Sequence, residues 1–323
     1  MKRKTISIIG TGVIGAGWAA RFLASGHYVK AYDPSERALK KLKKDVRNAL
    51  ASLKRVGLNK NASLKNLKCY SSINYAIRNT DFIQENAPEN EKIKTKLLSQ
   101  IDALSDKNVV IASSSSGLLP SKIQSQCKHP QRILIGHPFN PVYLLPLVEV
   151  VGGKKTSKTN IKKAVKIYES IGMKPLIVRK EIEGYISDRL QEALWRESLH
   201  LIKDGIATTE EIDDAIVYGP GLRWAFMGVC LTFHLAGGEA GMKHMLEQFG
   251  PALKLPWTKL KAPALDKKLK KLMISGTQKQ SKKFSIDDLE KQRDIFLIEI
   301  MKTLNKHQKN KFPNWKKKFN NFK

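Results

Sequence analysis

The sequence predicts an α/β fold, in which a doubly wound, mostly parallel sheet is followed by an all-helical domain. Short β-rich runs alternate with helix-like segments in the N-terminal half, and a glycine-rich turn joins the first run to the first helix. Strand signals fade after Glu183, while helical spacing continues. Strands that alternate with helices form parallel sheets with helices on both faces. We therefore expect an α/β domain over residues 1–183 and a helical domain over residues 184–323.

The strands and helices expected before residue 183 follow one another closely. The first strand is the β-branched run TISII, and a helix leads from the glycine-rich turn to about Ser25. Further strands are expected at 28–32, 81–86, 108–113, 132–137, 147–151 and 174–178, separated by helices at 35–56, 91–104 and 161–172. This alternation is the pattern of successive strand–helix–strand units.

The C-terminal part carries helical spacing alone. Apolar residues recur there at intervals of three and four, which is the period of a helix with one buried face. A capping box, Ser285-x-x-Asp288, opens the last expected helix, which runs to about Lys306. The other helices are expected at 185–202, 210–218, 225–235 and 239–249.

The chain is strongly basic, with 58 Lys and Arg against 29 Asp and Glu and a net charge of +29. Such a balance can indicate nucleic acid, an anionic membrane or acidic substrates as partners. The lysine clusters at 40–44 and 267–271 lie in helix-like patterns typical of solvated faces, and only the tail at 311–323 interleaves aromatics with lysines. Zinc-finger spacing and an aromatic-rich RNA-binding signature are both missing, so nucleic acid is not the predicted partner.

Cys69, Cys127 and Cys230 are scattered, and they form neither a disulfide framework nor a Cys-x-x-Cys site. This usage fits a reducing compartment and predicts a cytoplasmic protein without a metal site. Apolar runs are too short to span a bilayer. The basic, apolar N-terminus has features of a signal peptide, but a strand, a glycine turn and a helix account for the same residues in more detail.

The turn GTGVIG matches a dinucleotide-binding fingerprint and predicts a Rossmann-type domain. Gly10 permits a tight turn, Gly12 lets a pyrophosphate approach the backbone at the helix N-terminus, and Gly15 allows close packing of helix on strand. The intervening residues of the predicted cofactor site are Thr11, Val13 and Ile14.

Asp33 follows Gly10 by 23 residues and ends the second expected strand. A carboxylate at this place hydrogen-bonds the ribose 2′-hydroxyl and repels a 2′-phosphate, which favours NAD over NADP. Arg37 nearby is the residue type that a 2′-phosphate would use. The alternative is a structural turn, but the fingerprint, its context and Asp33 together favour dinucleotide binding.

The stretch GHPFNPVYLLPLVEV places His137 at the end of an expected strand and Glu149 twelve residues later. Ligands of doubly wound sheets bind beyond the carboxyl ends of the strands, so His137 is expected beside a nicotinamide ring. Removal of a hydride from an alcohol needs a base for the hydroxyl proton, and histidine titrates in the right range. Glu149 on the next strand can hold the other ring nitrogen.

A lone histidine at a strand end is more often structural, but a hydroxyl cluster at Ser113–Ser116 supports catalysis. It follows the strand NVVIA and is expected at the same edge of the sheet as His137. A serine there can hydrogen-bond the reacting oxygen, although one of the four can also cap a helix.

The fingerprint, Ser116, HPFNP and Glu149 together resemble the 3-hydroxyacyl-CoA dehydrogenase superfamily. The resemblance implies a Rossmann domain that binds NAD, followed by a helical domain that forms a homodimer. It also implies that His137 and Glu149 are the catalytic pair and that Ser116 binds the substrate hydroxyl.

Two further segments carry this resemblance. The run ENAPENEKIK is similar to the family's loop beside the cofactor, which places Glu89 and Lys94 near NAD. In GYISDRL, the family's active-site asparagine falls on Asp188. This departure introduces a negative charge where the acyl-CoA enzymes have a neutral amide.

The segment from ALWRESLH to about residue 260 resembles one branch of the superfamily, whose substrate is a 3-hydroxy acid with a quaternary ammonium group. Aromatic faces and a carboxylate bind such a cation, because it has no hydrogen to donate. By hypothesis Asp188 supplies the counter-charge and Arg223 pairs with the substrate carboxylate. The candidate aromatic walls, each also typical of a core residue, are Trp224, Phe226, Phe233, Tyr143 and Trp195.

Three alternatives remain open at this point. A 3-hydroxyacyl-CoA dehydrogenase would use the basic surface for CoA phosphates, and a gulonate-type dehydrogenase would act on a sugar acid. A crystallin-like structural protein of the same fold would need no active site, and the intact set of Ser116, His137 and Glu149 argues against it. The predicted partners are a small-molecule substrate and a second copy of the chain, with no membrane.

Overall fold

A computed structural model of the chain describes residues 3–225, 228–237, 239, 241–249, 251, 255–258, 261, 264, 266–272, 275 and 286–310. The chain divides into two compact units, Met1–Arg189 and Leu190–Lys323. The division falls within helix α7 (Ser187–Lys203). The predicted order of an α/β domain followed by a helical domain is confirmed.

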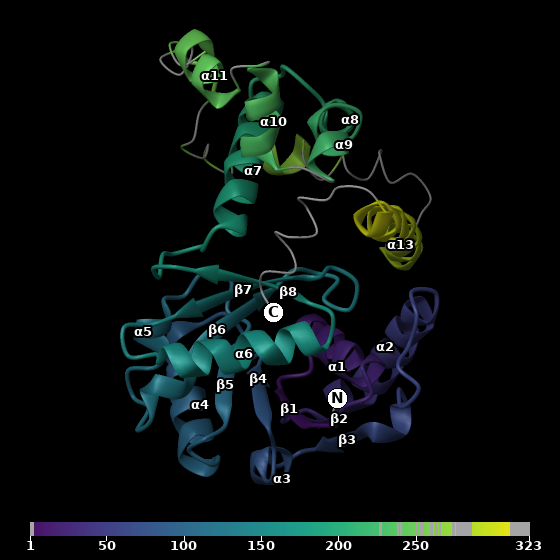
Figure 1. Cartoon of the computed structure of the whole chain (residues 1–323), viewed down its shortest axis with the longest axis vertical. Coiled ribbons are helices and arrows are strands. Elements are labelled where there is room, and N and C mark those ends of the chain that lie inside the picture. Colours follow the sequence, from purple (N-terminus) through teal and green to yellow (C-terminus); the bar gives the residue numbers. More distant parts are fainter. Residues whose placement is uncertain are drawn as a thin grey trace. The chain divides into compact units, whose positions relative to one another are not determined.

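The first unit is built on an eight-stranded sheet with the order β3-β2-β1-β4-β5-β6-β7-β8 (Figure 1). The strands are β1 (Thr5–Ile9), β2 (Tyr28–Tyr32), β3 (Leu67–Tyr70), β4 (Phe82–Glu85), β5 (Val110–Ser113), β6 (Ile133–Pro138), β7 (Leu147–Gly152) and β8 (Lys174–Val178). All neighbouring strands are parallel except β6 and β7. The predicted doubly wound, mostly parallel sheet is therefore confirmed.

The reversal at β7 has a simple cause. Only residues 139–146 connect β6 to β7. A parallel neighbour needs a crossover of about a dozen residues or more, so this short connection forces an antiparallel pair. The resulting register places His137 directly opposite Glu149.

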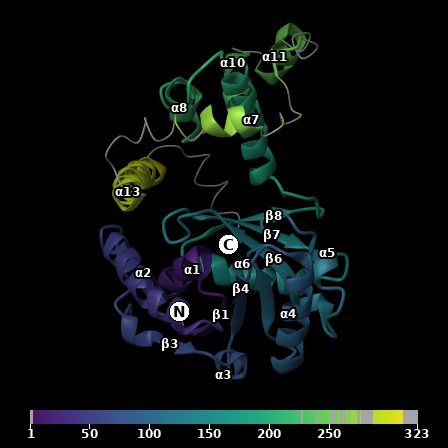
Figure 2. The same cartoon turned by 180° about the vertical axis from the view of Figure 1, so that it is seen from behind.

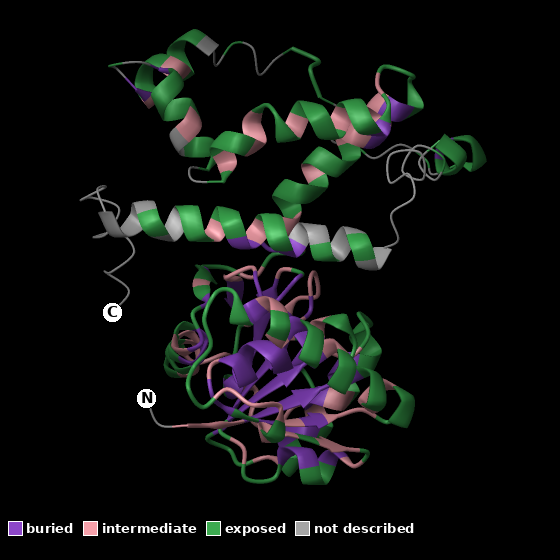
Figure 3. Cartoon of the chain, turned by 90° about the vertical axis from the view of Figure 1, so that its right-hand side faces the viewer, coloured by how far each residue is buried: buried purple, intermediate pink, exposed green. Residues whose placement is uncertain are grey.

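Helices cover both faces of the sheet (Figures 1 and 2). One face packs against α1 (Val13–Ala24), α2 (Glu36–Lys54) and α6 (Lys158–Ser170), and the other against α3 (Ile73–Ile77), α4 (Glu91–Leu104) and α5 (Pro120–Ile123). The strands between these layers are buried, as Figure 3 shows in purple. The sheet thus supplies a rigid edge on which loops are held.

The lysine-rich helix α2 illustrates how the sequence specifies these layers. The side chain of Ser35 accepts a hydrogen bond from the Ala38 amide and begins the helix. Its buried residues, spaced three and four apart, are Leu42, Val46, Ala49 and Leu53. The lysines between them are mostly exposed, which agrees with the expected solvated face.

The described residues of the second unit form helices joined by turns and loops, and none of them is assigned to a strand. Its helices, besides most of α7, are α8 (Thr209–Val217), α9 (Pro220–Trp224), α10 (Val229–Ala236), α11 (Met242–Phe249) and α13 (Ile286–Asn310). Leu199, Ile202 and Leu269 form a small buried cluster there. The predicted cap Ser285 and the basic tail at 311–323 lie outside the described residues. Within the described ranges, no helix has the length and apolar character needed to cross a membrane.

Candidate active site

The glycine turn has the geometry that its three glycines predict. Gly10 has a φ of +88°, and a Cβ there would lie 2.7 Å from the Asn86 carbonyl oxygen. A Cβ on Gly15 would collide with the Gly10 carbonyl, whereas one on Gly12 would meet open space. Gly12 is the N-cap residue of α1, and no side chain hydrogen-bonds the amides at this N-terminus of the helix. Free amides of a first turn facing open space fit a pyrophosphate.

Asp33 lies at the end of β2 against this turn. Its Oδ2 accepts hydrogen bonds from the Thr11 amide and hydroxyl at 3.0 and 2.9 Å, and its Oδ1 accepts one from the Ser35 amide at 3.0 Å. A carboxylate has about four acceptor positions, so capacity remains for ribose hydroxyls. Val13 is exposed at the turn, whereas Ile14 packs against the core.

His137 and Glu149 form a buried pair across β6 and β7. The Nδ1 of His137 lies 2.9 Å from the Oε2 of Glu149, and the Glu149 side chain is fully buried. Because a carboxylate only accepts hydrogen bonds, this contact places the ring proton on Nδ1 and leaves a lone pair on Nε2. The rings of Phe139 and Tyr185 lie 4.9 and 5.5 Å from the imidazole and restrict its orientation.

The other oxygen of Glu149 binds the start of α7. Its Oε1 accepts the amides of Ile186 and Ser187, each at 3.0 Å, and the Ser187 hydroxyl at 3.3 Å. Burial by itself raises the pKa of Glu149, but hydrogen bonds from His137, Ser187 and Ile186 outweigh it and the pKa is lowered. Glu149 is thus an ionised acceptor that links the histidine to α7.

Asp188 faces the opposite side of the imidazole. Its Oδ2 lies 3.6 Å from Nε2 of His137, and its side chain is 28% exposed. The imidazole therefore lies between two carboxylates. Glu149 contacts Nδ1, and Asp188 lies beside Nε2, the nitrogen that can accept a proton. The sequence identified Asp188 as a departure from the family pattern, and the structure places it beside the predicted base.

The serine cluster is held by two glutamates. Oε1 of Glu89 accepts the Ser115 hydroxyl at 2.5 Å and the amides of Ser116 and Gly117 at 3.0 and 3.2 Å. Ser113 donates to Glu85. Since β5 and β6 are parallel, this loop ends at the same edge of the sheet as His137, as predicted.

Lys94 lies beneath this loop. Its side chain is 1% exposed, and its ammonium lies 3.0 Å from Glu85, 3.7 Å from Glu89 and 2.8 Å from the Ala87 carbonyl. Charged groups are buried only when they are paired in this way. Lys94 and Glu85 therefore fix Glu89, and Glu89 fixes the backbone of Ser116.

Several of these contacts involve residues that the sequence did not single out, namely Glu85, Tyr185 and the amides of Ile186 and Ser187. A signal exists for Glu85, which is the one charged residue in the buried run FIQE. Tyr185 has a φ of +46°, which is unusual for a bulky residue. Its hydroxyl donates to the Leu118 carbonyl at 2.7 Å. The contact of Tyr185 and the amide contacts of Ile186 and Ser187 are not announced by any local sequence pattern.

The remaining substrate candidates belong to the second unit or to the core. Arg223 and Trp224 end α9, where Arg223 is exposed and Trp224 is half-buried. Phe226 lies outside the described residues. Phe233 and Trp195 are each 46% exposed, and Tyr143 packs partly against the core of the first unit.

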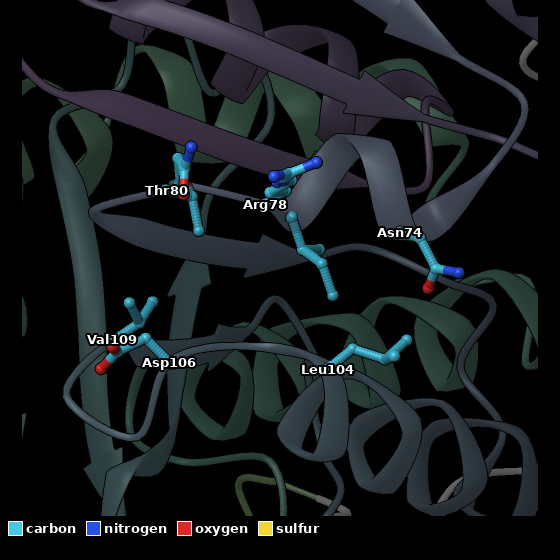
Figure 4. Close-up of a pocket in the computed structure, with 8 residues that line it drawn as sticks. Asn74, Arg78, Thr80, Leu104, Asp106 and Val109 are labelled. Atoms are coloured by element: carbon cyan, nitrogen blue, oxygen red, sulfur yellow. The ribbon is translucent and has the colours of Figure 1, made fainter.

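A cavity of about 470 Å³ lies at the opposite edge of the sheet (Figure 4). Its walls come from the segments that precede β4 and β5, including Asn74, Arg78, Thr80, Leu104, Asp106 and Val109. His137 lies instead at the carboxyl end of β6. The cavity is therefore separate from the candidate site.

A dinucleotide turn and a histidine–glutamate pair at one sheet edge define a dehydrogenase that removes hydride from a hydroxyl-bearing carbon. Models of known families agree with this class. Residues 5–182 match 3-hydroxyacyl-CoA dehydrogenase, NAD binding domain, and residues 184–280 match 3-hydroxyacyl-CoA dehydrogenase, C-terminal domain. The chain belongs to the 3-hydroxyacyl-CoA dehydrogenase family, and its cofactor is NAD.

Curated relatives are similar over nearly the whole chain. An L-carnitine dehydrogenase of Bacillus cereus is 52% identical over 304 residues, which cover 94% of this chain and 93% of that protein. An L-carnitine dehydrogenase of Pseudomonas putida is 56% identical over 82% of this chain and 83% of its own length. The similarity thus includes both domains.

Solved structures share the fold at lower identity. An NAD-dependent FHMPC 5-dehydrogenase has a TM-score of 0.79 and 25% identity, with 94% of this chain and 99% of that chain covered. A 3-hydroxybutyryl-CoA dehydrogenase from Ralstonia eutropha has a TM-score of 0.63 and 26% identity, with 85% and 95% covered.

Proposed function

We propose that this protein is an L-carnitine 3-dehydrogenase, which oxidises the 3-hydroxyl of L-carnitine to give 3-dehydrocarnitine and NADH in carnitine catabolism. The observation that carries the proposal is the 52% identity to an L-carnitine dehydrogenase over 94% of the chain. The His137–Glu149 pair, at 2.9 Å, supplies the base that this chemistry needs. The alternatives are a 3-hydroxyacyl-CoA dehydrogenase and a gulonate-type dehydrogenase.

NAD, when bound, accepts the hydride that leaves C3 of the substrate. The amides after Gly12 hold its pyrophosphate, and Asp33 holds its ribose hydroxyls. Glu89, with Lys94 below it, shapes the loop beside the nicotinamide end. The proposal for these residues is supported by the open space at Gly12 and by the acceptor capacity left on Asp33.

His137 takes the proton of the 3-hydroxyl on Nε2 while Nδ1–H stays bound to Glu149. The negative charge of Glu149 stabilises the imidazolium that forms, and its contacts to α7 prevent the ring from turning away. Ser116 donates a hydrogen bond to the reacting oxygen. By residue type, Arg223 is the proposed partner of a substrate carboxylate, and Trp224 and Phe226 are the proposed aromatic partners of its methyl groups. Residue chemistry alone supports these last three assignments.

The substrate is tested with purified protein, NAD and three compounds: L-carnitine, 3-hydroxybutyryl-CoA and L-gulonate. We expect NADH formation with L-carnitine at a kcat/KM at least about 100-fold above the others, because the chain is 52–56% identical to L-carnitine dehydrogenases over most of its length. Turnover of the CoA ester in preference to carnitine would contradict the proposal while leaving the His137 chemistry in place.

Asp33 is expected to set the choice of cofactor. Asp33→Asn removes the charge that repels a 2′-phosphate, so the preference for NAD over NADP in kcat/KM should fall about 10- to 100-fold. Steady-state kinetics with each cofactor measure this ratio, and the KM for L-carnitine serves as the control. Equal weakening of both cofactors would mean that Asp33 only supports the Thr11 turn.

We further propose that the protein is a cytoplasmic homodimer. The three cysteines are free, which suits a reducing compartment. Sedimentation or light scattering of the purified protein tests the dimer, and a monomer at micromolar concentration would contradict it.

A further inference from the structure

Asp188 occupies a position with a consequence for substrate choice. It lies in the first turn of α7, where a helix N-terminus favours a carboxylate. Its Oδ2 is 3.6 Å from the Nε2 of His137, the nitrogen to which the substrate hydroxyl must bind. At 3.6 Å the contact is longer than a hydrogen bond, so the Nε2 lone pair remains available to the substrate hydroxyl.

We propose that Asp188 is a specificity-determining residue, whose carboxylate selects a substrate with a cationic group on the carbon next to the carbinol. The inference rests on the proposed oxidation of a 3-hydroxy acid of this kind. The attraction between the Asp188 carboxylate and the cation would distinguish such a substrate from 3-hydroxy compounds that lack a positive charge.

Bond lengths make this assignment geometrically reasonable. A hydroxyl bound to Nε2 lies about 3 Å from that nitrogen. A cationic nitrogen two carbons from the hydroxyl oxygen lies about 3–4 Å from it, according to the rotamer. A carboxylate oxygen 3.6 Å from Nε2 then faces the region that the cation enters. A quaternary ammonium needs no hydrogen-bond partner, so this proximity is sufficient for an attractive contact through its methyl groups.

The charges around this position agree with the role. The other carboxylate at the imidazole, Glu149, already receives hydrogen bonds from His137, Ile186 and Ser187. The next residue along the helix, Arg189, directs its guanidinium at the Glu183 carbonyl, 3.3 Å away. Asp188 is partly exposed, whereas Glu149 is fully buried, so Asp188 is the carboxylate that a ligand can reach.

The test compares two substrates of the same shape in two enzymes. The substrates are L-carnitine and 3-hydroxy-5,5-dimethylhexanoate, in which carbon replaces the ammonium nitrogen. The enzymes are the full-length parent and Asp188→Asn. We expect Asp188→Asn to lower kcat/KM for L-carnitine about 10- to 100-fold, mainly through KM, and to change kcat/KM for the isostere that lacks the cation by less than about 3-fold.

Two further measurements separate charge recognition from a damaged site. Asp188→Glu keeps the charge and should recover most of the preference for the cation. Binding of 4-trimethylammoniobutanoate, which lacks the hydroxyl and cannot react, should weaken in Asp188→Asn by the same factor as KM. Asp45→Asn, which removes an equal charge from the exposed Lys41–Asp45 pair on α2, should leave all constants unchanged.

The outcomes are distinct. If both substrates lose the same factor in Asp188→Asn, the residue acts on His137 or on folding and the inference is overturned. Unchanged carnitine kinetics overturn it as well. If the parent enzyme oxidises 3-hydroxybutyryl-CoA and leaves L-carnitine untouched, it is the proposed function that fails, before Asp188 is questioned.

Discussion

His137→Ala is expected to lower kcat for L-carnitine oxidation about 1,000-fold while NAD still binds with its normal affinity. A positioned general base contributes about 10²–10⁴-fold to a proton transfer. His137 is the base here because its Nε2 carries the free lone pair while Nδ1 is held 2.9 Å from Glu149. The glycine turn and Asp33 lie on other strands, so cofactor affinity should be retained. Single-turnover kinetics and a titration with NAD measure the two properties.

Two controls make this result specific. Added imidazole should restore part of the lost rate in His137→Ala, because the vacated space lies beside the reacting hydroxyl. His129→Ala removes a histidine outside the site, whose backbone amide binds Asp102, and should retain normal turnover. A His137→Ala enzyme with near-normal kcat would refute the assignment of the base.

The strong patterns of the sequence were sufficient for most of the sheet and its helices. The seven expected strands all form, because each has a β-branched or apolar run bounded by turn residues. The strand β3 was missed, since LKCY is a four-residue edge strand with no buried residue. The helices α3 and α5 were missed because five and four residues are too few to establish a period.

The candidate site was predicted in part. Local motifs identify Gly10, Asp33 and His137, since each depends on its place at a strand end. The direct pairing of His137 with Glu149 depends on the antiparallel register of β6 and β7, for which the short connection was an available signal. The burial of Glu85 had a signal in the apolar run FIQE, but its pairing with Lys94 could not be anticipated, because Lys94 alone resembles an exposed helix charge and only the fold brings the two together.

Glu149→Gln is expected to lower kcat about 10²–10³-fold, the second largest effect. The amide keeps the size of the side chain but removes the charge that stabilises the imidazolium, and it can face Nδ1 with either its oxygen or its NH₂ group. The correct tautomer of His137 is then no longer enforced. The amides of Ile186 and Ser187 also lose a charged acceptor.

The same substitution should change how stability depends on pH. The pKa of Glu149 is lowered in the folded protein, against about 4.3 in an unfolded chain. A carboxyl group of this kind stabilises the fold above its unfolded pKa, and that contribution disappears as the pH falls through the folded value. The Tm difference between the parent and Glu149→Gln should therefore be greatest at neutral pH and shrink as the pH falls below about 4.

A control variant distinguishes the catalytic role of Glu149 from a general effect of removing a hydrogen-bonded acid. Glu181 accepts two hydrogen bonds from Ser121, at 3.0 and 2.6 Å, and has no contact with His137. Glu181→Gln should leave kcat unchanged, whatever it does to Tm. If Glu149→Gln kept full activity, the carboxylate would serve only to tie α7 to β7.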